Sequence, residues 1–130
     1  MFDDSESVDR GSDGRTAVLL KAFVKITERW NLGRSEQQIL LATSRSTLNR
    51  WLRNPESAKL SRDQIERVSY VLGIFAGLHR ILGETPLADE WIARRNADFG
   101  DAPPIARMLG GNVGDLFYVR WYVDRWANQG

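Results

Sequence analysis

The sequence predicts an all-α fold. Two long segments, residues 15–30 and 62–82, repeat apolar residues at steps of three and four, which is the period of an amphipathic helix. Gly33 and Gly83 follow these segments and are typical helix ends. No stretch alternates apolar and polar residues over the length of a strand. With 42% hydrophobic residues, the 130-residue chain fits one folded domain or two small ones.

Three helices are expected in the first half. The first spans about residues 15–30, and its apolar stripe consists of Leu19, Phe23, Ile26 and Trp30. A short helix follows over residues 34–41. The next helix covers residues 45–53, with Ser44 as its N-cap because a serine oxygen can accept from the backbone of the first turn. It must end before Pro55, since proline disfavours helix in the residue ahead of it.

Shorter helices accompany one long helix in the second half. Ser61 precedes the long helix, and Asp63 in its first turn meets the helix dipole favourably. Its apolar stripe consists of Ile65, Val68, Leu72, Phe75, Leu78 and Leu82. Short helices are predicted over residues 86–94 and 104–109, with a loop at residues 96–104. The last helix begins at Asn112 or Gly114.

The two short helices of the first half are joined by a tight turn, which predicts a helix-turn-helix. The second of them, residues 45–53, needs an apolar face that fixes it to the first. That face consists of Leu48, Trp51 and Leu52.

The opposite face of this helix has the residue types that bind DNA. Arginine can pair with guanine, and asparagine with adenine, in the major groove. We therefore expect three side chains near base edges, namely Arg45, Ser46 and Asn49. Three others are better placed for phosphate contacts, namely Thr47, Arg50 and Arg53.

Two other interpretations fit the same residues. In the first, Arg50 and Arg53 are ordinary solvated residues of a helix. In the second, the helix-turn-helix is kept only as a scaffold. Ala42 stands where a turn glycine is usual, and Gln37 and Gln38 are less apolar than their counterparts in a typical repressor.

Positive charge gathers in the middle of the chain, although the net charge is only +1. Residues 1–28 hold four basic and six acidic residues, residues 29–67 hold eight and four, and residues 68–130 hold six and seven. A phosphate backbone favours such a basic segment. By charge alone, however, a solvated basic face is the better explanation.

Several classes of function are excluded or disfavoured. The chain has no cysteine and a single histidine, which excludes disulfides, thiolate metal sites and multi-histidine metal sites. Residues 1–14 are acidic, do not resemble a signal peptide and are expected to be disordered. No apolar run approaches the roughly 20 residues of a membrane span. We therefore expect a cytoplasmic protein without a membrane partner.

We also expect no enzymatic activity and no cofactor. His79 has no second histidine or cysteine to act with. Asp89 and Glu90 are neighbours on a helix and diverge, so they do not form a carboxylate pair. The glycine-rich residues 110–114 lack the Lys-Ser/Thr of a phosphate loop. No nucleophile, base and orienting group can be assembled.

The last helix has two apolar faces. Its core face consists of Leu116, Val119, Tyr122, Val123 and Trp126. Phe117 and Trp121 lie on the other side, four residues apart and therefore adjacent on the surface. Aromatic residues ringed by charges are typical of an interface anchor. Another helix of the chain, or a second copy, could cover them instead.

From about residue 64 onward the chain resembles the toxin-binding region of the Xre/MbcA/ParS-like antitoxins. The ordered motifs that show this are Arg67-Val68-Ser69, Leu72-Gly73-Ile74-Phe75, Leu78-His79-Arg80-Ile81-Leu82-Gly83, Ala88-Asp89-Glu90-Trp91-Ile92, Arg95-Asn96-Ala97, Phe99-Gly100, Pro103-Pro104-Ile105 and Val119-Arg120. The upstream part, from Trp30 to Trp51, also fits the N-terminal module of that family. The resemblance covers about 100 residues of the chain.

The resemblance implies partners rather than a reaction. It predicts a type II antitoxin that covers the active site of a RES-domain, NAD-consuming toxin and, with that toxin, represses its own operon. The expected modules are residues 15–60 for operator DNA and residues 61–130 for the toxin. We expect Phe117, Arg120 and Trp121 at the toxin contact, in a homodimer or a hetero-oligomer.

Two further interpretations remain open. One is a stand-alone helix-turn-helix regulator whose second half dimerises. The other is an interaction protein whose DNA module no longer functions.

Overall fold

The computed structural model describes the backbone of residues 2–129 and the side chains of residues 14–129. Within this part of the chain there are helices and turns but no strand, and the predicted all-α fold is confirmed. The α-helices are α1 (Phe2–Arg29), α2 (Arg34–Leu41), α3 (Arg45–Arg53), α4 (Arg62–Leu82), α5 (Pro86–Glu90), α6 (Pro104–Met108) and α7 (Val113–Ala127). Connections contain the 3-10 helices η1 (Pro55–Ser57), η2 (Trp91–Ala93) and η3 (Ala97–Phe99). None of the described helices is both long and apolar enough to span a membrane.

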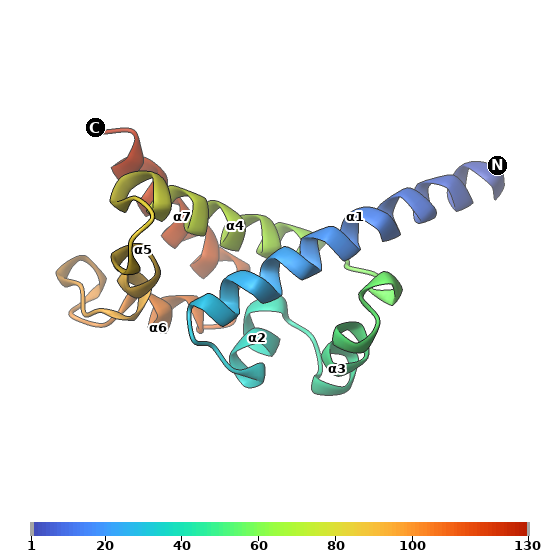
Figure 1. Cartoon of the computed structure of the whole chain (residues 1–130), viewed down its shortest axis with the longest axis horizontal. Helices are drawn as coiled ribbons and strands as arrows, with labels where there is room; N and C mark the ends of the chain where they lie inside the picture. The colour runs from blue at the N-terminus through green and yellow to red at the C-terminus, as the bar shows by residue number, and fades with distance from the viewer. Residues whose placement is uncertain (1, 130) are drawn as a thin grey trace.

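α1 packs against α4, in the second half of the chain, and against η1, in the first half (Figure 1). The helix begins at Phe2, earlier than the start near Arg15 that the apolar stripe predicts. The side chains of residues 1–13 lie outside the described residues. The predicted disordered segment over residues 1–14 therefore stays a prediction.

α2 and α3 have the bounds that the sequence predicts. The backbone N–H of Gly33 donates to Oε1 of Glu36 at 2.6 Å, which stabilises the first turn of α2. Ser44 is the N-cap of α3, and its Oγ accepts from the backbone N–H of Thr47 at 3.2 Å. α3 ends at Arg53, two residues before Pro55, as expected.

α4 and α7 form a closely packed pair (Figure 1). Ser61 and Gln64 start α4 with a reciprocal capping box, in which each side chain accepts from the other residue's backbone N–H. Gly77 lets the two helices approach, because a Cβ added there would lie 2.6 Å from Cγ1 of Val123. This helix pair is the framework on which the second half of the chain is built.

Two predicted segments differ in detail from the structure. The single helix expected over residues 86–94 is α5 followed by the tighter turn η2. The loop at residues 96–104 contains η3 and is closed by the backbone N–H of Asn96, which donates to the carbonyl of Ala102 at 3.2 Å. Helical periodicity does not distinguish these short tight turns from an α-helix or a loop, because they span less than one full repeat.

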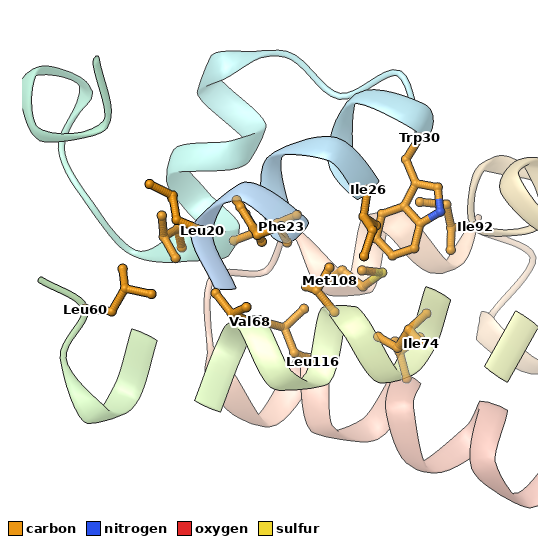
Figure 2. Packing of buried hydrophobic residues seen from close by; sticks show 14 of the residues in the cluster. Leu20, Phe23, Ile26, Trp30, Leu60, Val68, Ile74, Ile92, Met108 and Leu116 are labelled. Carbon is orange, nitrogen blue, oxygen red and sulfur yellow. The ribbon is translucent and has the colours of Figure 1, made fainter. Parts of the chain in front are cut away.

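Buried apolar residues from both halves form one cluster. Figure 2 shows Phe23 and Trp30 of α1 in this cluster together with Ile74 of α4 and Leu116 of α7. All four are at most 4% exposed. The first three helices and the α4–α7 pair therefore share a core, and the division into modules near residue 60 stays a prediction.

Candidate DNA-reading helix and aromatic face

The inner face of α3 is apolar and buried, as the sequence predicts. Leu48 is 0% exposed and Trp51 is 5% exposed, while Leu52 packs at the edge of the core. α2 and η1 contact α3 and hold it in place. The other face of α3 is consequently turned to solvent.

That outer face presents cations to solvent. Arg45, Ser46, Arg50 and Arg53 are exposed. No carboxylate within residues 14–129 forms an ion pair with any of these three arginines. Their guanidinium groups are therefore available for phosphate or base contacts.

Thr47 and Asn49 are half-buried on the flanks of α3. The side chain of Ser44, which caps the helix, also lies 3.4 Å from Oγ of Ser46. The N-terminal turn of α3, the part that enters a major groove in helix-turn-helix proteins, is thus ordered by its own cap.

The turn between α2 and α3 has the geometry for which glycine is usual. Ala42 adopts φ +56° and ψ +53°, the left-handed region. An alanine tolerates this conformation at a cost of about 1–2 kcal/mol. Ala42 therefore adopts the backbone conformation that glycine usually supplies at this turn.

The polar residue at Gln37 is accommodated by a buried network. Gln37 is 0% exposed, and its Nε2 donates to Oγ1 of Thr27 at 2.9 Å. The Thr27 hydroxyl donates to the carbonyl of Phe23, also at 2.9 Å. Arg34 donates to Oε1 of Gln37 at 2.6 Å. Both polar ends of the amide are satisfied, so this departure from an apolar pattern does not weaken the packing of α2.

Arg67 joins the helix-turn-helix to the second half of the chain. Its side chain is 9% exposed and is paired with Asp63 at 2.8 Å. Its guanidinium also donates to the carbonyls of Leu40 at 3.3 Å and Gly111 at 3.1 Å. Leu40 lies in the last turn of α2, and Gly111 lies in the turn before α7.

Sequence reasoning missed this role, although a signal exists. Arg67 shares one face of α4 with Val71, Ile74 and Leu78 at helical spacing, and all three are buried. An arginine on a core stripe, four residues after an aspartate, indicates a paired buried cation.

Phe117 and Trp121 are exposed on α7, as predicted from their helical positions. Phe117 is 51% exposed and lies edge-on to Tyr70 of α4, at 5.8 Å between ring centroids. Trp121 is 41% exposed and stacks on Tyr118 at 5.8 Å. The two rings therefore form a pair of exposed aromatic side chains on one face of α7.

Arg120 occupies a different environment from its two aromatic neighbours. Its Nη1 donates to the carbonyl of Ser69 on α4 at 3.2 Å, and its Nε is paired with Asp124 at 3.0 Å. The guanidinium lies over Gly73, where a Cβ would collide with it. Arg120 therefore ties α7 to α4 beneath the exposed aromatic residues.

A second aromatic group lies beside this face. Trp91 contacts Phe99, Tyr122 and Trp126 at centroid distances of 5.9–6.0 Å. Tyr122 donates its hydroxyl to Asp98 at 2.6 Å, and this hydrogen bond, together with burial, raises the pKa of Tyr122 above its usual value. The partners of Trp91 come from two other elements, η3 and α7, so the sequence did not reveal the group.

His79 belongs to a polar network with Glu84, Asp89 and Arg29. Its Nε2 lies 2.9 Å from Asp89, its Nδ1 lies 3.0 Å from Glu84, and Arg29 of α1 donates to Asp89 at 2.8 Å. Burial alone would raise the pKa of Asp89, but the hydrogen bonds from His79 and Arg29 outweigh it and lower the pKa. The described residues include no cluster of three or more His, Cys, Asp or Glu side chains that could hold a metal ion.

The fold and the exposed face of α3 define a helix-turn-helix protein of the DNA-binding class. The family model of the antitoxin Xre-like helix-turn-helix domain matches residues 9–73. A protein of Sinorhizobium fredii (strain NBRC 101917 / NGR234), named uncharacterized protein y4oB, is 36% identical over 111 residues, which cover 85% of this chain and 84% of the relative. The chain belongs to the family of Xre-like helix-turn-helix antitoxins.

Proposed function

We propose that this chain is the antitoxin of a type II toxin–antitoxin system. It neutralises a RES-domain, NAD-consuming toxin by covering the toxin's active site, and the complex represses its own operon. The observation that supports this best is the presence of two separate surfaces on one core. Arginines without an ion pair among residues 14–129 lie on α3, and the exposed aromatic residues Phe117 and Trp121 lie on α7.

On the DNA side, the N-terminal turn of α3 enters the major groove of the operator. Arg45, Ser46 and Asn49 then reach base edges, while Thr47, Arg50 and Arg53 contact phosphates.

Affinity for the chain's own promoter is measured by fluorescence anisotropy at several salt concentrations. Arg45→Ala removes the preference for the promoter over a scrambled duplex. Arg50→Ala weakens binding to the promoter and to the scrambled duplex alike, and it reduces the dependence of binding on salt.

Equal effects of the two substitutions on both duplexes would contradict the assignment of Arg45 to base edges. Arg62→Ala is the matched control, because Arg62 is exposed on α4 and also lacks an ion pair within residues 14–129.

On the toxin side, Phe117, Arg120 and Trp121 form the contact, with the two aromatic side chains as its anchors. Trp121→Ala weakens capture of the RES-domain toxin by about tenfold or more, as expected for a central aromatic anchor. Its unfolding midpoint stays close to that of the unchanged chain, because the side chain is 41% exposed. A loss of folding without a separate loss of binding would assign Trp121 to the core instead.

The exposed aromatic face also favours a second candidate, a stand-alone regulator that dimerises through α7. Helix-turn-helix proteins commonly read paired half-sites as dimers. Light scattering separates the two candidates. A dimer that Trp121→Ala converts to monomer, in a chain that captures no toxin, supports the regulator.

A further inference from the structure

Two hollows meet around Trp126 at the carboxyl ends of α4 and α7. One has a volume of about 510 Å³ and is lined by Trp121, Tyr122 and Arg125, among others. The other has a volume of about 530 Å³ and includes Arg80 of α4. Trp126 and Gln129 line both. We call this surface the Trp126 groove: Arg80, Trp121, Tyr122, Arg125, Trp126 and Gln129.

The cations of the groove lack carboxylate partners. Elsewhere in this half of the chain, Arg94 is paired with Glu90, Arg107 with Asp115 and Arg120 with Asp124, at 2.8–3.0 Å. No carboxylate within residues 14–129 forms an ion pair with Arg80 or Arg125. Asp98 lies at one edge, but it already accepts the hydroxyl of Tyr122. The groove therefore offers two exposed positive charges that no carboxylate of residues 14–129 pairs with.

The apolar floor of the groove is preformed. Trp126 and Tyr122 pack against Trp91 at 5.9 Å between centroids, which fixes both rings from behind. Arg125 lies over the ring of Trp121 at 5.0 Å from its centroid. Binding to such a surface costs little side-chain entropy, because its aromatic residues are already held in place.

Trp121 connects the groove to the exposed face that includes Phe117. It lines the groove and is itself 41% exposed. Two cations that flank an aromatic floor, with Asp98 nearby, do not make a continuous path for a phosphate backbone. They suit a protein segment that has both a carboxylate and an apolar side chain.

We propose that the Trp126 groove binds an acidic segment of the partner protein. Its carboxylates pair with Arg80 and Arg125, and one apolar or aromatic side chain between them packs on Trp126. This inference rests on the proposed antitoxin function, with the toxin as the partner. It extends the contact from Phe117 and Trp121 to the ends of both helices.

The test uses charge reversal in the full-length chain, with a purified RES-domain toxin from the same genome as the probe. Arg80→Glu and Arg125→Glu each weaken toxin binding by about tenfold in calorimetry at low salt, and the effect shrinks at high salt. Arg80→Gln and Arg125→Gln weaken it less, because they remove the pairing without adding repulsion. Lys59→Glu, at an exposed cation outside both the groove and the expected toxin-binding residues 61–130, changes toxin binding less than about twofold.

Two further measurements on the same variants exclude other roles. Arg80 and Arg125 each lie in the last turn of a helix, where a cation also meets the helix dipole favourably. The unfolding midpoints of the variants therefore stay near that of the unchanged chain, and a fall that parallels the loss of toxin binding would assign both arginines to helix stability and overturn the proposal. Affinity for a promoter duplex also has to stay unchanged, and a loss there would assign the groove to nucleic acid and overturn the proposal.

The outcomes separate the groove from the proposed function. Unchanged toxin affinity in the Arg80→Glu and Arg125→Glu variants overturns the proposal that the groove binds the toxin, but it does not contradict the antitoxin function. An unchanged chain that binds no RES-domain toxin overturns both.

Discussion

Single residues decide how well the helix-turn-helix tolerates its unusual sequence. Gln37 is buried in the core, and the hydroxyl of Thr27 supplies the acceptor that its amide needs. Ala42 adopts a left-handed conformation that glycine adopts at no steric cost. The first departure is compensated by a partner, whereas the second remains a local strain.

Ala42→Gly is expected to stabilise the protein because it removes this strain. The gain is about 1 kcal/mol, since the relief of the left-handed conformation is partly offset by the greater backbone freedom of glycine in the unfolded chain. Urea unfolding followed by tryptophan fluorescence measures it. Ala76→Gly, at an exposed position within α4, serves as the control and is expected to destabilise by about 1 kcal/mol. A destabilised Ala42→Gly protein would contradict the turn geometry.

At the scale of elements, the contact between α4 and α7 depends on the absence of a side chain at Gly77. Val123 fills the space that a Cβ would need, and it is β-branched and 0% exposed. Gly73 allows a different contact, because the three atoms nearest to a Cβ there all belong to the guanidinium end of the long Arg120 side chain. The two glycines of α4 therefore differ in how much a methyl group would disturb the helix pair.

Gly77→Ala is expected to destabilise the protein, even though alanine is the better helix former. The clash with Val123 costs about 1–3 kcal/mol and outweighs a propensity gain of about 1 kcal/mol. In a Val123→Ala background the same substitution becomes neutral or stabilising, because the space is then free. Double-mutant analysis of thermal unfolding checks this coupling. Additive effects would show that the two residues do not compete for the same space.

At the scale of the whole molecule, polar residues join parts that are distant in the sequence. Arg67 connects the end of α2, the start of α4 and the turn before α7. Asp89 connects α1 and α4 through Arg29 and His79. Both links lie between the DNA-reading part and the half of the chain with the aromatic face.

Arg67→Met is expected to cost roughly 3 kcal/mol of stability, because it leaves buried carbonyls without a donor. Hydrogen exchange becomes faster both at the end of α2 and in the turn before α7. Arg62→Met is the control, since Arg62 is exposed on the same helix and has no ion pair within residues 14–129. Faster exchange at only one of the two places would contradict the linking role.

Stability is expected to fall in acid partly through Asp89. Because the pKa of Asp89 is lower in the folded protein than its ordinary 3.8, its contribution is present above about pH 4 and is lost as the pH falls through the folded value. Unfolding midpoints between pH 2 and 6 measure this loss. Asp89→Asn reduces the dependence of the unfolding midpoint on pH in this range. Asp101→Asn, at an exposed position, leaves that dependence unchanged.

The sequence by itself determined the helices, the buried face of α3 and the exposure of Phe117 and Trp121. Each of these follows from residue spacing within one helix, which is a local property. The tertiary structure alone decided which distant groups Arg67 and Arg120 contact, the pairing of Gln37 with Thr27 and the aromatic group around Trp91. The partners that define these contacts beyond a single helix lie 8 to 51 residues away in the chain. Periodicity describes which face of a helix is apolar, but it contains no information about which distant element covers that face.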